Sequence, residues 1–274
     1  MEREIALEMR GVSKYFGSVV ANKNVNLKVY KGEILAVLGE NGSGKTTLMN
    51  MISGIYFPDE GQMFVGGEEA VIRSPQDAFA YKIGMIHQHF KLVDIFTAAQ
   101  NIVLGVKNEP KPVDDKKNAF SKFFAKIGRK MESGLYKKKE VAAQVKEIAD
   151  KYGFEIDPNK KIYDMSVSEK QTVEIVKVLY RGANVLILDE PTRGIDVGAK
   201  YEIYCIIADL AKQGKSIIMI SSEMSEIIGM SNRVMVMCDG RITGFIDGKD
   251  ATQENIMALA TQFETAPEAA AANQ

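Results

Sequence analysis

The sequence predicts an α/β fold with a mainly parallel core sheet, a small antiparallel β subdomain and an inserted helical subdomain. Three short apolar runs, at residues 34–38, 185–188 and 217–220, have the length of buried strands. Apolar and polar residues alternate over much of the first thirty residues, as is typical of antiparallel strands. Residues 90–165 have mainly helical spacing and interrupt the series of strands.

The composition is that of an ordinary globular protein. With 274 residues, 46% of them hydrophobic, the chain can bury the core of one large domain. Thirty-five basic and thirty-six acidic side chains leave a formal charge of −1, which excludes a general attraction to nucleic acid or anionic lipid. No apolar run is long enough for a membrane span and the first residues lack a secretory signal, so we expect a cytosolic protein or one held at a membrane by a partner. Cys205 and Cys238 lie in apolar stretches without metal-ligand spacing, and we expect two buried, free thiols.

Near the N-terminus, three runs are expected to form a small antiparallel sheet: residues 5–9, 25–29 and 62–65. A turn-rich connection at 14–24 separates the first two and contains Phe16. An exposed ring close to a nucleotide site can stack on a base, so we expect Phe16, rather than Tyr15, to contact a nucleotide. The alternative is that the ring belongs to the core of the sheet.

Residues 39–46 read Gly-Glu-Asn-Gly-Ser-Gly-Lys-Thr and predict a loop that binds the phosphates of a nucleotide. The loop follows the apolar run at 34–38 and precedes a helical run at 47–53, which is the order that such a site requires. Glycines let the backbone approach phosphate oxygens, and the start of the helix adds unpaired N–H groups and a positive dipole. Lys45 is expected to reach the β- and γ-phosphates and Thr46 to ligate Mg²⁺. The residues expected to bind the nucleoside triphosphate here are Gly39, Glu40, Asn41, Gly42, Ser43, Gly44, Lys45, Thr46 and Thr47.

Polar side chains also follow the other predicted strands at their carboxyl ends, where α/β sheets place ligand-contacting residues. Gln88 follows a short strand at 83–86, and Asp189 with Glu190 follows the second apolar run. A carboxylate at that position can hold Mg²⁺ through water, and a second one can polarise an attacking water. The alternative, that the two acids cap the next helix, fits less well because Pro191 follows them.

The histidines beside Gln88 form a weak candidate for a metal site. His87 and His89 are separated by one residue and no third ligand is in view, so we expect both to lie in a solvated loop. Further along, residues 234–237 and 241–245 are expected to form a hairpin.

Residues 106–140 carry eleven Lys or Arg against five acids, and apolar side chains recur at helical spacing within 116–135. We expect a basic amphipathic helix, which can lie on an anionic membrane or a membrane partner, or pack on its own domain. A second helix is expected at 141–152. The expected organisation is one domain at 1–262 with a helical subdomain at about 90–180, followed by a disordered tail at 263–274.

The order of these motifs resembles that of the ATP-binding subunits of ABC transporters over nearly the whole chain. Residues 165–171, Met-Ser-Val-Ser-Glu-Lys-Gln, resemble the signature segment of that family. The other matches are the Walker A loop at 39–46, the Q-loop at Gln88, the Walker B strand at 185–190, the D-loop at Asp196 and the switch position at Ser222.

The resemblance implies an ABC-type P-loop NTPase fold in which two domains meet head to tail and hold ATP and Mg²⁺ between them. Glu190 would align the hydrolytic water, and Gln88 would sense the γ-phosphate and Mg²⁺ beside the metal ligands Thr46 and Asp189. The catalytic positions are then Glu190, Gln88 and Ser222. The signature segment and the D-loop would bring further residues to ATP, namely Ser166, Ser168, Glu169 and Asp196. The helical insert would contact a membrane permease, which places the protein on the cytoplasmic face of the cell membrane.

Closer likeness narrows the substrate class. Residues 84–90, 101–105 and 190–200 are similar to importers of simple sugars and nucleosides. In that group one polypeptide usually carries two ATP-binding halves; up to Thr192 this chain resembles the first half, and from Arg193 onward the end of the second. The implied partners are permease subunits, a second ABC domain and, indirectly, a solute-binding protein, with no nucleic acid.

Two departures from the family pattern concern hydrolysis. The signature normally reads Ser-Gly-Gly-Gln, whereas Ser166-Val167-Ser168-Glu169 lacks both glycines and carries an acid that can face the triphosphate. The switch position normally holds His, and Ser222 cannot carry the proton or charge of an imidazole. We therefore expect ATP binding with weak turnover, and an asymmetric heterodimer with one productive site.

Three alternatives remain open. A slow homodimer assisted by permease contact can replace the heterodimer. An ATP-binding clamp with little hydrolysis is the second alternative. A soluble ABC protein of translation or DNA repair is the third, and it is disfavoured because no sustained heptad run is present.

Overall fold

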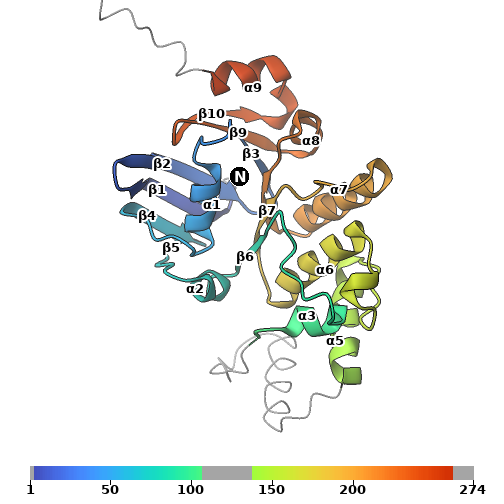
Figure 1. Cartoon of the computed structure of the whole chain (residues 1–274). Helices are drawn as coiled ribbons and strands as arrows, with labels where there is room; N and C mark the ends of the chain where they lie inside the picture. Colours follow the sequence, from blue (N-terminus) through green and yellow to red (C-terminus); the bar gives the residue numbers. More distant parts are fainter. Residues whose placement is uncertain (1–2, 107–137, 262–274) are drawn as a thin grey trace, which may run out of the picture. The chain divides into compact units, whose positions relative to one another are not determined.

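The computed structural model describes residues 3–106 and 138–261, which form two compact units. The first unit comprises the described residues up to Lys91 and from Gly182 onward, and the second those from Leu92 to Arg181 (Figure 1). The predicted amphipathic helix at 116–135 and the predicted tail at 263–274 lie outside the described residues.

A six-stranded sheet is the central feature of the first unit, and the predicted α/β class is confirmed. Its strand order is β10 (Arg241–Asp247), β9 (Arg233–Cys238), β3 (Ile34–Leu38), β8 (Ser216–Ile220), β7 (Val185–Asp189) and β6 (Ile83–Ile86). All neighbouring strands are parallel except β10, which pairs with β9 as the predicted antiparallel hairpin. Because β3, β6, β7 and β8 run in the same direction, the residues that follow them emerge at one edge of the sheet.

A second, antiparallel sheet has the order β2 (Val19–Tyr30), β1 (Ile5–Phe16), β4 (Glu60–Val65) and β5 (Glu68–Glu69). The expected turn-rich connection at 14–24 is wrong, because β1 and β2 pair from Ile5–Tyr30 to Phe16–Val19 and leave only two residues for the turn. The pairing contains register shifts, one of them around Gly11, whose φ is 62°. Such irregularities interrupt the alternation of polar and apolar residues. The alternation therefore predicted strands that are shorter than β1 and β2.

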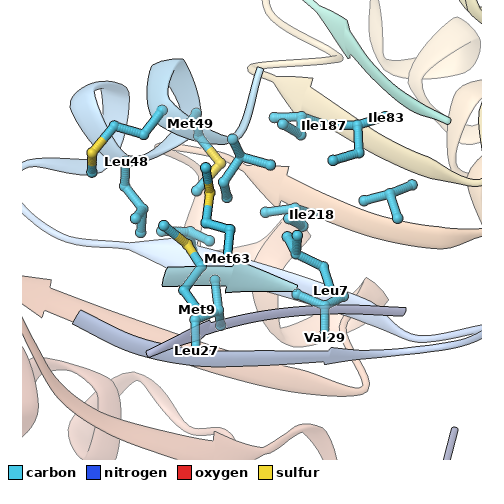
Figure 2. Close-up of a cluster of buried hydrophobic side chains, with 14 of the residues drawn as sticks. Leu7, Met9, Leu27, Val29, Leu48, Met49, Met63, Ile83, Ile187 and Ile218 are labelled. Carbon is cyan, nitrogen blue, oxygen red and sulfur yellow. The ribbon is translucent and has the colours of Figure 1, made fainter. Parts of the chain in front are cut away.

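One hydrophobic cluster joins both sheets to helix α1 (Lys45–Ile52). Figure 2 shows Leu48 and Met49 of α1 among side chains from the strands, with Leu7 of β1 and Ile218 of β8 in the same cluster. Leu48 and Met49 have no exposed surface, and burial of such a side chain stabilises a fold by about 1.5–3 kcal/mol. The helix that begins at the phosphate loop is thereby held by the core.

The remaining helices of the first unit are α2 (Pro75–Ala80), α7 (Val197–Lys212), α8 (Met224–Met230), η2 (Gly248–Asp250) and α9 (Gln253–Ala260). The prediction of buried thiols is wrong, because Cys205 on α7 is exposed and Cys238 is only partly buried. Cys205 lies four and eight residues after the exposed Tyr201 and Val197, so it shares their face of the helix. The apolar composition of α7 concealed that only its other face is buried.

The described part of the second unit contains α3 (Ala98–Val103), α5 (Lys138–Tyr152), η1 (Ile162–Asp164) and α6 (Val167–Tyr180), and these three α-helices contact one another. Helix α5 includes the predicted helix at 141–152. The buried Asn101 holds the segment before α3, because its side chain accepts from the Val93 N–H at 2.7 Å and donates to the Val93 carbonyl at 3.1 Å. No helix of the described residues is long and apolar enough to cross a bilayer.

Candidate functional site

The phosphate loop connects the carboxyl end of β3 to the start of α1. Gly44 is the N-cap of α1, has a φ of 93° and provides no side-chain cap. A Cβ at this position would lie 2.5 Å from the Ala21 carbonyl oxygen and 2.6 Å from the Asn22 side chain, so only glycine fits without rearrangement. Since no side chain caps the helix, its first N–H groups remain available to an anion, and the arrangement fits a triphosphate.

Two further contacts hold this loop, and the sequence did not predict either. The buried Asn22 of β2 donates from Nδ2 to the Gly44 carbonyl at 3.3 Å, and the Gly240 N–H donates to the Ser43 carbonyl at 3.1 Å. Gly240 belongs to the turn between β9 and β10, almost 200 residues further along the chain. Strand pairing brings both residues to the loop, so local sequence patterns do not predict these contacts. A polar Asn within a sheet could nevertheless have marked Asn22 as a residue with a specific hydrogen-bond partner.

Lys45 folds back across the loop that contains it. Its ammonium donates to the carbonyls of Gly39 at 2.6 Å and Glu40 at 2.8 Å. Burial lowers the pKa of Lys45, and the nearby carboxylates of Glu190 and Asp189 oppose that effect. The structure therefore brings the predicted phosphate-binding lysine into the electrostatic field of the two acids at the carboxyl end of β7, Asp189 and Glu190.

These acids differ in their surroundings. Burial raises the pKa of Asp189, and the electrostatic influence of His87 and Lys45 counteracts the rise. Glu190 has a φ of 51°, a backbone conformation that is uncommon for a residue with a side chain and that clusters at functional sites. The Ser222 hydroxyl donates to Glu190 Oε2 at 3.1 Å. Two predicted catalytic positions, 32 residues apart in sequence, thus form a direct pair.

The residues predicted to hold Mg²⁺ offer one hydroxyl, one amide oxygen and one carboxylate, from Thr46, Gln88 and Asp189. Among the described residues no group of three or more His, Cys, Asp or Glu side chains could hold a metal by itself. Mg²⁺ is commonly bound by one or two carboxylates together with substrate phosphates and water. The donor set therefore fits Mg²⁺ that arrives with a nucleotide.

The two histidines beside Gln88 differ in exposure. His89 is exposed, as expected for a solvated loop. His87 is half-buried, and it counteracts the rise in the pKa of Asp189.

Phe16 is the last residue of β1 and is 43% exposed. Its ring packs edge-to-face on Tyr56 at a centroid distance of 5.1 Å, and Lys14 Nζ lies 5.5 Å from the ring centroid. The exposed part of the ring remains available for stacking, which fits the predicted contact with a base.

In the second unit, the signature-like residues form the start of α6. Ser166 is the N-cap and accepts from the Glu169 N–H at 3.2 Å, while Glu169 accepts from the Ser166 N–H at 2.8 Å. The Glu169 carboxylate also pairs with Lys160 at 2.6 Å, and this hydrogen bond lowers the pKa of Glu169. The Ser168 hydroxyl lies 3.1 Å from that of Ser166. The acid is therefore engaged by a capping box and a lysine of its own unit.

Asp196 occupies the equivalent position on α7 in the first unit. It is the N-cap of α7, and its side chain accepts from the Ala199 N–H at 3.1 Å. This capping role accounts for an acid at that position, and it fixes the start of the helix close in sequence to Glu190.

Comparisons with known proteins show the family of this chain. The ABC transporter family model matches residues 22–193. The guanosine import ATP-binding protein NupO of Bacillus subtilis is 42% identical over 93% of this chain and 46% of its own length. The nucleoside import ATP-binding protein NupA of Lactococcus lactis is 40% identical, with 94% and 47% covered. The ribose import ATP-binding protein RbsA of Clostridium perfringens is 36% identical, with 94% and 48% covered. The chain spans about half the length of these curated relatives.

Solved structures support the same fold. A nucleotide-free ATP-binding cassette from an ABC transporter superposes with a TM-score of 0.74 at 24% identity, covering 93% of this chain and 95% of that one. The ADP conformation of the ATP-binding cassette MJ1267 gives a TM-score of 0.74 at 21% identity, with 95% and 96% covered. The fold of the chain is that of these cassettes. Since the family model matches more than half of the chain, the chain belongs to the ABC transporter family.

Proposed function

We propose that the chain binds ATP with Mg²⁺ and hydrolyses it to drive import of a simple sugar or nucleoside through a membrane permease. The observation that carries this proposal is the pairing of Glu190 with Ser222 beside Lys45, at the edge of the sheet where the phosphate loop begins. The names of the relatives, which import guanosine, nucleosides and ribose, support the substrate class.

The geometry suggests what each residue does. The triphosphate lies on the N–H groups of the loop and of α1, and Lys45 exchanges the carbonyls of Gly39 and Glu40 for phosphate oxygens. Phe16 stacks on the adenine. Mg²⁺ supplies positive charge to the phosphates, and Thr46, Gln88 and Asp189 would hold it.

Hydrolysis needs an oriented water close to the γ-phosphate. Glu190 accepts the proton of that water as it attacks, and the Ser222 hydroxyl fixes the orientation of the Glu190 carboxylate. Serine cannot add the positive charge that a histidine would bring to the phosphate, so we expect slower turnover than in ATPases with a switch histidine.

Two kinds of partner are proposed. A second ABC domain would complete the ATP site, and permease subunits would bind the chain at the cytoplasmic face of the membrane. Each signature segment, with Ser166, Ser168 and Glu169, would face the ATP of the other domain, and Asp196 would lie close to the same interface. Because Glu169 is engaged by Lys160 and by the Ser166 N–H, its charge is partly compensated and one backbone donor of the signature segment is occupied within the chain. With that donor occupied and both signature glycines replaced, we favour the asymmetric heterodimer over two equal sites. A solute-binding protein would act through the permease.

Restoring the signature is expected to accelerate hydrolysis. We expect the combined change Val167→Gly, Ser168→Gly and Glu169→Gln to raise the ATPase rate of the isolated chain by about tenfold, equivalent to roughly 1.4 kcal/mol of barrier. The two glycines replace Val and Ser in the first turn of α6 and lower its helix propensity by less than the roughly 1 kcal/mol that separates Gly from Ala, so urea unfolding is measured in parallel. A rapid rate in the unaltered chain with no gain on restoration would contradict the heterodimer argument.

Co-expression with a permease tests the proposed function directly. The chain is expected to co-purify with its permease, and ATP turnover in that complex is expected to increase when the cognate sugar or nucleoside is supplied. Vesicles that contain the complex with Lys45→Ala, which binds ATP more weakly, serve as the control and are expected to show less uptake at limiting ATP. Co-purification without turnover would favour the ATP-binding clamp, and failure to bind any permease would favour a soluble ABC protein.

A further inference from the structure

A buried polar cluster surrounds Glu226 on α8, outside the residues that the sequence singled out. Glu226 is 4% exposed, and its carboxylate accepts hydrogen bonds from four side chains. The donors are Thr192, Tyr204 at 2.6 Å and Lys200 at 3.3 Å on Oε1, and Ser221 at 2.6 Å on Oε2. Both Thr192 and Ser221 are themselves buried.

The two carboxylate oxygens hold two different segments of the chain. Oε1 binds Thr192, which lies two residues after Glu190, and Oε2 binds Ser221, which directly precedes Ser222. The pair Glu190–Ser222 is therefore supported from both sides by a single side chain. The Ser221 hydroxyl also accepts from the Glu223 N–H at 3.0 Å, which continues the support along the segment that contains Ser222.

The cluster is built around a charged carboxylate. Burial acts to raise the pKa of Glu226, but the hydrogen bonds from Ser221, Thr192, Tyr204 and Lys200 outweigh burial and hold the pKa below its ordinary value. Burial together with the bond to Glu226 raises the pKa of Tyr204 to about 12, so the phenol remains a donor. A buried carboxylate with this many donors is satisfied only while all of them stay in place.

We propose that Glu226 is a positioning residue for hydrolysis, which ties the segment after Glu190 to the segment before Ser222 and so fixes the geometry of the Glu190–Ser222 pair. The inference rests on the proposed ATPase function. It predicts that Glu226→Gln, although isosteric, loses hydrogen bonds to the cluster, because glutamine has one acceptor oxygen and an NH₂ group that only donates. In Glu226→Gln either the Thr192 side or the Ser221 side loses its acceptor.

A matched control is available in the same unit. Glu33 is also 4% exposed, and its carboxylate accepts from Arg233 Nε at 2.9 Å and from the Tyr30 N–H at 2.9 Å. It directly precedes β3, at the amino end of the parallel strands, whereas Glu190 follows the carboxyl end of β7. Glu33→Gln therefore disturbs a buried carboxylate of equal exposure far from the proposed catalytic pair.

The experiment compares Glu226→Gln and Glu33→Gln in the full chain by three measurements. Urea unfolding reports stability, titration with a fluorescent ATP analogue reports nucleotide affinity, and ATPase assays report kcat and KM. We expect both variants to unfold at lower urea, but only Glu226→Gln to lose about 10- to 100-fold in kcat, with nucleotide affinity within about twofold of the parent. A similar loss of kcat in both variants, or an unchanged kcat in Glu226→Gln, would overturn the proposal.

Hydrogen–deuterium exchange gives a readout that does not depend on turnover. In Glu226→Gln we expect faster exchange in both segments, 190–196 and 219–224, whereas Glu33→Gln leaves both unchanged. Unchanged exchange in these segments would overturn the proposal. A parent chain without ATPase activity in its permease complex would instead contradict the proposed function, while exchange would still decide whether Glu226 holds both segments. If Glu226→Gln does not fold, Ser221→Ala removes one donor only and is expected to show a smaller fall in kcat with faster exchange at 219–224.

Discussion

Glu190→Gln is expected to lower ATP turnover by about 10²- to 10⁴-fold, the contribution typical of a positioned general base, while ATP still binds. The amide has the size of the carboxylate and can still accept the hydrogen bond that Ser222 donates at 3.1 Å, so the local structure should persist. It cannot accept the proton of the attacking water. Because ATP stays uncleaved, dimers that hold it are expected to accumulate.

The measurement is phosphate release under saturating ATP, together with size-exclusion chromatography in the presence of ATP and Mg²⁺. Glu202→Gln is the matched control, since Glu202 is an exposed acid on α7, and it is expected to keep the parent rate. Hydrolysis by Glu190→Gln at the parent rate would show that another group activates the water.

Lys45→Ala is expected to weaken ATP binding by about ten- to a hundredfold, because a hydrogen bond between charged partners contributes roughly 1.5–3 kcal/mol. The Lys45 ammonium donates to the carbonyls of Gly39 and Glu40, so part of its interaction energy with phosphate is offset by the bonds it gives up. This exchange favours the lower half of the expected range.

Competition of ATP against a fluorescent analogue measures this change, and a reporter of that kind is required because the chain contains no Trp. Lys31→Ala is the control, because Lys31 is an exposed lysine of the first unit and, among the described residues, forms its ion pair with the exposed Glu4. An unchanged affinity in a folded Lys45→Ala variant would remove Lys45 from the nucleotide site.

Features that depend on a few consecutive residues were accessible from the sequence. The phosphate loop at 39–46, the buried strands β3, β7 and β8, and the hairpin of β9 and β10 all follow from local spacing, because apolar runs and glycine positions directly reflect backbone conformation. The placement of Asp189 and Glu190 at the end of a strand follows in the same way.

Features that depend on pairing between distant segments could not be predicted from the sequence. The register of β1 with β2, the exposed face of α7 that contains Cys205, and the engagement of Glu169 by Lys160 each depend on which neighbour a residue meets in space. Local periodicity carries little information on this point, since the same pattern fits several registers and several rotamers.

The sequence by itself therefore identified the candidate groups of the site: a loop for phosphate, a lysine, two acids at a strand end and a serine where the family resemblance leads us to expect a histidine. The tertiary structure decided how these groups are held. Parallel pairing of β7 with β8 brings Glu190 to Ser222. The buried Glu226 accepts hydrogen bonds from Thr192 and Ser221 and so holds the segments that contain Glu190 and Ser222. The physical reason is that reactive groups are specified by residue type, whereas their orientation depends on hydrogen bonds between segments that only the folded chain brings together.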